Sequence, residues 1–308
     1  MTDRFQKVTI VGGAGGVGAS AAFNLVLLRG GHEVVLVDTR PELITSHVMD
    51  LEQVLELSPG STVRGGDESD LADADVLVVL AATPLTVGTS RLDYLAKNAR
   101  IVDGIGDLLG ASFAGVVLVV TNPVDPLVTR LYRRTRLDRR RILGYTINDS
   151  LRLRTGLAKA LGVPAGAVDA WAIGEHGDLS VPLLDRVVVN GVPVHPTAAE
   201  ATAALEYFRT WYVRHVALDS GRSSTWTSGL ALARMVAALG RSGELWPASV
   251  VLEGEYGIDG VAVSVPVTIG RGGVEQIHEW ELGPADLAAL RASAELVRAA
   301  ATETIHEP

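Results

Sequence analysis

A histidine between two glycines is the first feature that could do chemistry. The segment Gly174-Glu175-His176-Gly177-Asp178 follows an apolar run that predicts a strand, so His176 stands at a strand end. Glycine on both sides permits backbone angles barred to other residues and lets a substrate approach closely. An imidazole changes charge near neutral pH and suits catalysis, although a lone loop histidine is more often a surface residue.

Asp149 and Arg152 form a second candidate pair. Asn148-Asp149-Ser150 predicts the cap of a helix that runs to Leu161. Residues three apart on a helix share one face, so both charged groups can reach one pocket. An acid–base pair at this spacing is also common on surfaces, and that alternative stays open.

A glycine-rich turn lies near the start of the chain. Lys7 to Val11 predicts a strand, Ala19 to Leu28 predicts a helix, and Gly13, Gly15 and Gly18 between them fit the pattern G-x-G-x-x-G. The first glycine of this pattern makes a tight turn, the second admits a pyrophosphate, and the third lets helix and strand pack closely. The helix N-terminus offers free N–H groups to the phosphates.

An acidic residue strengthens the prediction of a dinucleotide site. Asp38 follows a strand predicted for Val34 to Val37 and lies 20 residues beyond Gly18. A carboxylate there bonds the adenosine ribose and repels a 2′-phosphate, which favours NAD over NADP. Arg40, two residues later, is a reason to keep NADP open, and a Rossmann-like turn without nucleotide is the remaining alternative.

The first half of the chain alternates predicted strands and helices. Apolar runs at Asp75 to Ala81 and Val116 to Thr121 are typical of parallel strands covered on both faces. Asn122 follows the second run at the carboxyl edge of the sheet, where ligands of such folds bind, so we expect it to point toward the site. Pro41 to Leu57 predicts a helix that could serve an interface, and the loop from Ala82 to Arg91 predicts a lid.

The second half has α+β character. Ile142 to Gly144 predicts the last strand of the first sheet, so we expect a dinucleotide-binding domain at 1–145 and a substrate and catalytic domain at 146–308. The fold class is therefore α/β, a Rossmann-type doubly wound parallel sheet followed by an α+β domain.

Composition excludes several functions. A net charge of -9 argues against nucleic acid and anionic membranes as partners, and the one basic run, Arg133 to Arg141, is interpreted as a solvated face. The absence of cysteine excludes thiolate chemistry and Cys-metal sites, and we predict no metal. No charged leader with an apolar stretch opens the chain and no apolar run is long enough to span a membrane, so we expect a cytoplasmic protein.

Along nearly its full length the chain resembles the lactate/malate dehydrogenases. The motifs that match, in the order and at about the spacing of that family, are Gly13-Ala14-Gly15-Gly16-Val17-Gly18, Asp38, Arg91-Leu92-Asp93, Thr121-Asn122-Pro123-Val124-Asp125, Asn148-Asp149-Ser150-Leu151-Arg152, Gly174-Glu175-His176-Gly177-Asp178 and Ser223-Ser224-Thr225-Trp226. The resemblance implies an NAD-dependent oxidoreductase that acts on a small 2-hydroxy or 2-oxo acid as a homodimer or homotetramer.

The same resemblance implies a role for each matching residue. His176 would exchange the proton with the substrate oxygen, and Asp149 would hold its tautomer and raise its pKa. Arg152 would bind the substrate carboxylate through two parallel hydrogen bonds. Arg91 would polarise the carbonyl after closure of a loop hinged at Gly88. Asn122 would bond the substrate oxygen and contact the cofactor, and Ser224 would line the substrate pocket.

Two departures leave the substrate open. Six residues before Arg91 the family has Arg in malate and Gln in lactate dehydrogenases, whereas this chain has Leu85, and Arg222 is a cation that the family pattern does not predict. An apolar substrate group facing Leu85 is the first interpretation. The alternatives are a malate dehydrogenase in which Arg222 binds the second carboxylate, and, in another class, a catalytically idle NAD-binding sensor or assembly protein.

Overall fold

Six parallel strands form the first part of a large sheet. The computed structural model describes residues 7–28, 30–83, 91–110 and 112–303, without the side chains of residues 91–93 and 303. The parallel strands pair in the order β3-β2-β1-β4-β5-β6. Their bounds are Lys7–Val11 (β1), Glu33–Val37 (β2), Thr62–Gly65 (β3), Val76–Val79 (β4), Val116–Val119 (β5) and Ile142–Tyr145 (β6). The order reverses between β1 and β4, where doubly wound folds bind their ligands.

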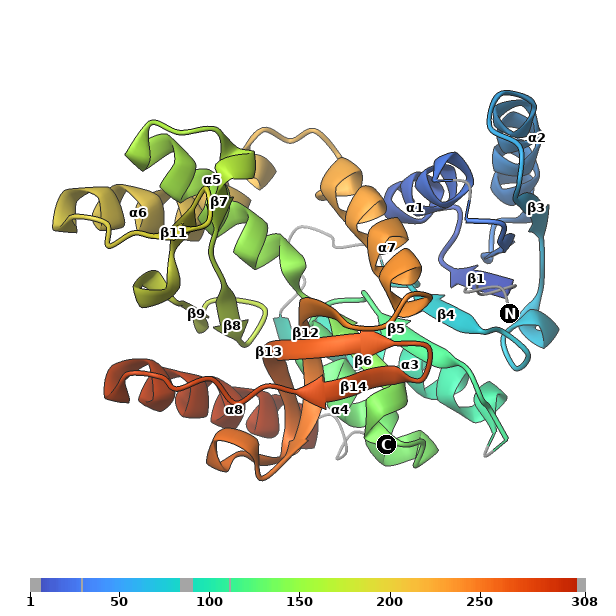
Figure 1. Ribbon diagram of the computed structural model, residues 1–308. Helices are drawn as coiled ribbons and strands as arrows, with labels where there is room; N and C mark the ends of the chain where they lie inside the picture. Colours follow the sequence, from blue (N-terminus) through green and yellow to red (C-terminus); the bar gives the residue numbers. More distant parts are fainter. Residues whose placement is uncertain (1–6, 29, 84–90, 111, 304–308) are drawn as a thin grey trace.

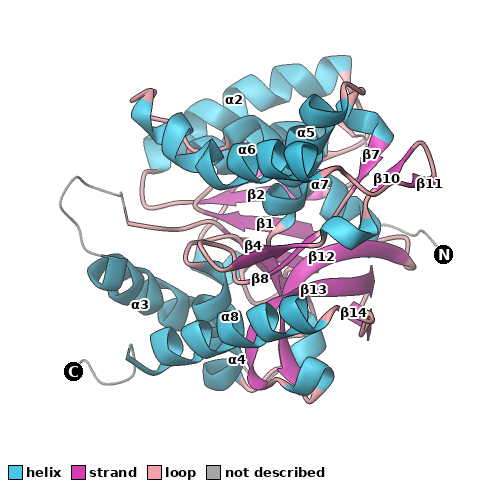
Figure 2. Ribbon diagram, turned by 90° about the vertical axis from the view of Figure 1, so that its left-hand side faces the viewer, coloured by secondary structure: helices cyan, strands magenta, loops and turns pink. Residues whose placement is uncertain are grey.

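Helices alternate with these strands and lie on both faces of the sheet (Figures 1 and 2). Their bounds are Gly16–Leu27 (α1), Pro41–Leu57 (α2), Arg91–Leu109 (α3) and Val124–Thr135 (α4). Along β4, Val76 and Val78 belong to one buried core, whereas Leu77 and Val79 belong to a second one on the opposite face. Successive side chains of a strand point to opposite faces, so a continuous apolar run is required where both faces are covered. The predicted strands and the helix Pro41–Leu57 are confirmed, while α1 begins three residues earlier than predicted because its first turn is made of Gly16, Val17 and Gly18.

The sheet does not end at β6, so that prediction is wrong. β12 (Glu244–Glu253) pairs antiparallel with β6 through Ala248 with Tyr145 and Ser249 with Gly144. Gly144 makes this approach possible, because a Cβ there would lie 2.7 Å from the Cβ of Ser249. β13, β8 and β9 continue the sheet, and β14 pairs with β13.

The second half supplies these antiparallel strands, a small separate sheet and four helices among the described residues. The strands are Val168–Asp169 (β7), Ala172–Gly174 (β8), Ser180–Pro182 (β9), Val188–Val189 (β10), Val192–Pro193 (β11), Asp259–Gly270 (β13) and Gly273–Ile277 (β14). The helices are Ile147–Leu161 (α5), Ala198–Ala217 (α6), Thr225–Leu239 (α7) and Pro284–Glu303 (α8). Helix α5 packs on α6 and α1 packs on α7, while α8 lies beside α4 (Figures 1 and 2). Within the described part of the chain, no helix is both long and apolar enough to cross a bilayer.

Candidate active site

His176 directly follows the short strand β8, as predicted. Gly174 adopts a left-handed backbone with φ of +87°, and a Cβ there would lie 3.0 Å from Oγ of Ser293. A Cβ on Gly177 would meet the carboxyl group of Glu175 at 2.3 Å. Gly174 therefore adopts a backbone conformation that favours glycine, whereas a side chain at Gly177 would displace the carboxyl group of Glu175.

Asp149 binds the imidazole from helix α5. Its Oδ2 lies 2.5 Å from Nδ1 of His176, and the two side chains are only 11% and 13% exposed. Burial of the ring lowers the pKa of His176, but the charge and hydrogen bond of Asp149, together with the charge of Asp125, outweigh burial and raise the pKa above its ordinary value of 6.5. The ring is thus held with Nδ1 occupied and Nε2 as the nitrogen left for a reacting group.

The predicted helix cap is wrong, and the reason concerns the site. Helix α5 begins at Ile147 with Thr146 at the N-cap, so residues 148–150 lie within its first turn. Asn148 donates to Ser228 at 3.0 Å, and Oγ of Ser150 accepts from the backbone N–H of Ala172 at 3.0 Å. These side chains tie the helix to the interior instead of capping it, and this fixes where α5 presents Asp149.

Arg152 lies one turn further along α5, on the same face. Its guanidinium contacts Asp149 at 3.2 Å and donates to Oγ of Ser224 at 3.3 Å. It also lies over the ring of Trp211 in α6, 4.5 Å from the ring centroid. The predicted site residues Asp149, Arg152 and Ser224 therefore come together, and because the side chains of Arg152 and Asp149 are only 17% and 11% exposed, the alternative of a surface ion pair is wrong.

Trp211 takes part in a series of side-chain contacts that the sequence does not predict. Its ring stacks on His215, with 4.9 Å between the centroids, and Nε2 of His215 donates to the carbonyl of Arg222 at 3.0 Å. The guanidinium of Arg222 is exposed and lies over the ring of Trp226 at 5.7 Å. An aromatic residue on an amphipathic helix is usually a core residue, so spacing alone does not single out Trp211.

The glycine turn after β1 has the form of a phosphate cradle. A Cβ on Gly18 would lie 2.4 Å from the carbonyl oxygen of Gly12, which confirms the close packing expected of the third glycine. The left-handed residue of the turn is Gly12, with φ of +91°, one position before the predicted Gly13. Gly15 is the N-cap of α1 and has no side-chain cap, so the first N–H groups of the helix face outward without a competing carboxylate.

Asp38 stands at the end of β2 beside this turn. Its Oδ2 accepts from the backbone N–H of Ala14 at 3.1 Å, and its Oδ1 accepts from Nε of Arg40 at 3.0 Å. Burial raises the pKa of Asp38, but the hydrogen bonds from Arg40 and Ala14 outweigh it, and the pKa is lower than usual. An ionised acceptor at this position fits the ribose of an adenine dinucleotide.

Asn122 lies three residues after the end of β5, and it is exposed at the carboxyl edge of the sheet. Its carbonyl accepts from Nδ2 of Asn98 at 2.7 Å, and Oδ1 of Asn98 accepts from the backbone N–H of Thr83 at 2.9 Å. The buried Asn98, on α3, therefore connects the chain after β4 with the chain after β5. Leu85 and the hinge at Gly88 lie outside the described residues, and Arg91 is described only as the first residue of α3.

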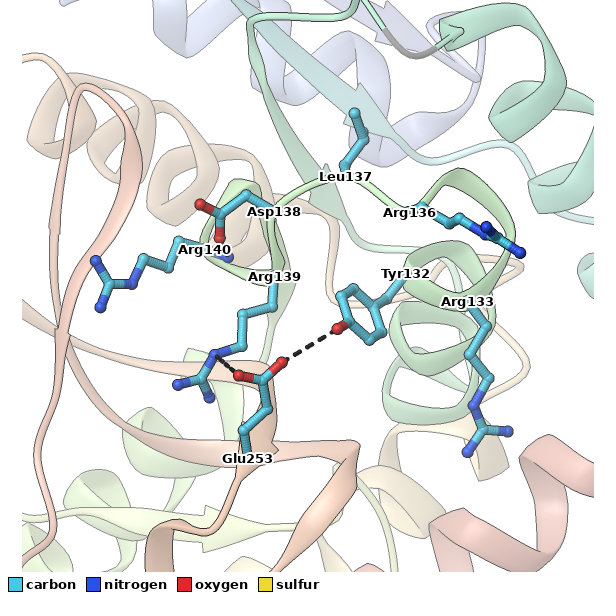
Figure 3. Close-up of a pocket in the computed structure, with 8 residues that line it drawn as sticks. All are labelled: Tyr132, Arg133, Arg136, Leu137, Asp138, Arg139, Arg140 and Glu253. Atoms are coloured by element: carbon cyan, nitrogen blue, oxygen red, sulfur yellow. Dashed lines mark hydrogen bonds and ion pairs between the residues drawn. The ribbon is translucent and has the colours of Figure 1, made fainter.

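The basic run does not join this site. A hollow of about 570 Å³ at the end of α4 is lined by Arg133, Arg136, Arg139 and Arg140 together with Tyr132, Leu137, Asp138 and Glu253 (Figure 3). Arg139 is paired with Glu253 at 3.2 Å, and the side chains of Arg133 and Arg136 point away from Arg140 (Figure 3). The exposed arginines fit the expected solvated face.

Comparison with known proteins accounts for both halves of the chain. Residues 6–144 match the model of the lactate/malate dehydrogenase NAD binding domain, and residues 146–307 match that of the lactate/malate dehydrogenase alpha/beta C-terminal domain. The chain belongs to the lactate/malate dehydrogenase family. It is an NAD-dependent dehydrogenase that acts on a CH–OH group.

Relatives of this dehydrogenase carry both usual activities in their names. A malate dehydrogenase of Halobacterium salinarum is 38% identical over 90% of this chain and 92% of its own length. An L-lactate dehydrogenase of Lactobacillus delbrueckii subsp. bulgaricus is 36% identical over 96% of this chain and 97% of its own. Among solved structures, the minor L-lactate dehydrogenase of Enterococcus mundtii in a ligand-bound form superposes with a TM-score of 0.91 at 26% identity, covering 98% of this chain and 99% of that one. The family is therefore established, and similarity does not choose between the two substrates.

Proposed function

We propose that this dehydrogenase interconverts a small 2-oxo acid and its 2-hydroxy acid. We propose further that the variable group on C2, beside the oxygen and the carboxylate, is aliphatic or otherwise apolar. The observation that carries the proposal is the contact of His176 Nδ1 with Asp149 Oδ2 at 2.5 Å, one helical turn from Arg152. A proton-transfer group and a carboxylate-binding group then both contact Asp149 and lie close together, as a 2-oxo acid requires.

His176 is the proposed acid and base. Asp149 occupies Nδ1, so Nε2 is the atom that gives a proton to the substrate oxygen in reduction and takes it back in oxidation. The nicotinamide supplies or accepts the hydride when the cofactor is bound. The raised pKa of His176 keeps more of the ring protonated near neutral pH, which favours reduction.

Arg152 is the proposed carboxylate-binding residue. Its stacking on Trp211 and its bond to Ser224 limit the rotation of the guanidinium, so its N–H groups are ordered before the substrate arrives. Bidentate recognition depends on that planar order. Arg91, Asn122 and Leu85 keep the roles expected from the sequence: polarisation of the carbonyl, a bond to the substrate oxygen, and contact with the variable group.

The proposed cofactor site consists of Gly13, Gly15 and Gly18 for the pyrophosphate and Asp38 for the adenosine ribose. The open first turn of α1 and the ionised Asp38 support NAD in this place. The proposed domain border remains between residues 145 and 146, and we propose a cytoplasmic location.

We also propose that the chain assembles as a homodimer or homotetramer through the side that carries α1, α2 and α7. Large apolar side chains are exposed there, among them Phe23 (42%), Met49 (60%) and Leu57 (83%). A hollow of about 1220 Å³ on this side is lined by α1, α5, α7 and β12. Exposed apolar surface of this kind marks an interaction site.

A panel of 2-oxo acids tests the proposed function. The substrate-dependent oxidation of NADH is measured with pyruvate, 2-oxobutyrate, a branched homologue and oxaloacetate, and NADH binding is measured separately. Turnover with 2-oxobutyrate or a branched acid at least equal to that with pyruvate supports the proposal. NADH binding without turnover on any acid supports the idle NAD-binding protein instead.

A further inference from the structure

Asp125 contacts the backbone of His176, whereas Asp149 contacts its ring. It lies in the first turn of α4 and is only 1% exposed. Its Oδ2 accepts a hydrogen bond from the backbone N–H of His176 at 2.7 Å. The histidine is thus held twice, at its ring by α5 and at its backbone by α4.

The other oxygen of Asp125 is an exception among the described residues. Only two buried polar side-chain atoms there lack a hydrogen-bond partner, Oδ1 of Asp125 and Oγ of Ser249. Ser249 is fully buried on β12, and its hydroxyl lies close enough to the carboxyl group of Asp125 to lower its pKa. A buried carboxyl group with a free oxygen disfavours folding, so its presence requires an explanation.

The charges around Asp125 explain why a buried carboxyl group is present there. Burial raises the pKa of Asp125 to about 7, against the nearby hydroxyl of Ser249, the hydrogen bond from the His176 backbone and the charge of His176, while the charge of Glu175 raises it further. In turn, the charge of Asp125 raises the pKa of His176, which Asp149 also faces from α5 and which the charge of Arg152 opposes. Asp125 and His176 therefore each favour the charged form of the other.

We infer that Asp125 is a positioning residue for His176, fixing its backbone through Oδ2 and stabilising its imidazolium through the charge of the buried carboxylate. The inference rests on the proposed role of His176 as proton donor. A merely structural aspartate would affect folding and overall rate without moving the ionisation of the histidine.

Asp125→Asn separates the charge from the hydrogen bond. The amide oxygen can still accept from the His176 N–H, and the amide nitrogen can donate to Ser249, so the chain can fold as before. We expect the alkaline limb of the kcat/KM profile for 2-oxo acid reduction to move to lower pH by at least about half a unit, with a nearly unchanged rate on its acidic side. Asp103→Asn is the control, because it removes the same charge from another helix, where the side chain is 16% exposed and is paired with Arg130 at 2.6 Å, and it should leave the limb in place.

A second readout does not depend on turnover. The imidazole signal of His176 among the seven histidines is assigned by its loss in His176→Asn, and its pKa is measured by NMR titration. The pKa of His176 should fall in Asp125→Asn. It should fall by a smaller amount in Ser249→Ala, where the neutral form of Asp125 is favoured. An unchanged pKa of His176 in a folded Asp125→Asn variant overturns the inference. If the wild-type enzyme turned over none of the 2-oxo acids, only the proposed function would be overturned, because the titration would still test the link between Asp125 and His176.

Discussion

The guanidinium of Arg152 lies 4.5 Å from the ring centroid of Trp211 while it donates to Ser224 at 3.3 Å. The first contact fixes the plane of the guanidinium, and the second fixes its rotation within that plane. Arg152 is therefore ordered by α6 and by the start of α7, although it belongs to α5.

Arg152→Lys should raise the KM for the 2-oxo acid sharply. An ammonium is a single point charge that cannot form two parallel hydrogen bonds to a carboxylate and stacks less well on an indole. Steady-state kinetics with varied acid at saturating NADH measures the effect, and Trp211→Leu should raise KM in the same direction by a smaller factor. An unchanged KM in Arg152→Lys would place the carboxylate elsewhere.

The direction of the pH dependence follows from the raised pKa of His176. Reduction needs the protonated ring, so its kcat/KM should stay high up to a pH above 6.5 and fall as the pH rises through the raised pKa. Oxidation needs the neutral ring and should show the opposite limb. Asp149→Asn removes the largest favourable contribution and should move both limbs to lower pH, measured in both directions with one acid pair. Limbs that stay in place in that variant would mean that Asp149 does not set the pKa.

NADH should be preferred over NADPH, because the pKa of Asp38 is lower than usual and its carboxylate is the proposed partner of the adenosine ribose. Asp38→Ser should reduce or reverse the preference, since it removes the negative charge and releases Arg40 from its 3.0 Å contact. The ratio of kcat/KM for the two cofactors measures this. Asp107→Ser removes an equally charged surface residue that pairs with Arg134 and serves as the control. Equal kcat/KM values for NADH and NADPH in the wild type would contradict the cofactor assignment.

Leu85 is expected to disfavour oxaloacetate. An apolar lid residue offers no partner to a second carboxylate, and burial of an unpaired charge costs several kcal/mol, whereas each buried CH₂ contributes about 0.8 kcal/mol. Leu85→Arg should therefore shift the kcat/KM ratio toward oxaloacetate. A wild type that already prefers oxaloacetate by about tenfold or more, roughly 1.4 kcal/mol, would contradict this reading. Arg222→Ala would then test the other cation, which lies exposed over Trp226.

Local patterns in the sequence predict much of this fold and site. The apolar runs mark β4 and β5 because both faces of the sheet are covered, and the i,i+3 spacing places Asp149 and Arg152 on one face of α5. The glycine pattern marks the turn after β1, since backbone approach leaves no space for a Cβ at Gly18.

Features that depend on distant contacts are not predictable in this way. The pairing of β12 with β6 joins segments about a hundred residues apart, and the local sequence around Gly144 does not indicate which strand pairs with it. The first turn of α5 looks like a cap because Asn, Asp and Ser are common there, yet the interior uses their side chains. Trp211 and Asp125 act through contacts with Arg152 and His176 that only the tertiary structure brings together.

The most direct test of the central claim, that His176 transfers the proton, is turnover of the preferred 2-oxo acid by wild type and His176→Asn, with NADH affinity measured in parallel. We expect kcat to fall by about 10²-fold or more at nearly unchanged NADH affinity, because a proton-transfer group contributes roughly 10²–10⁴-fold and lies away from the proposed adenosine site. Near-normal kcat in a folded His176→Asn enzyme would contradict the claim and remove His176 from the reaction.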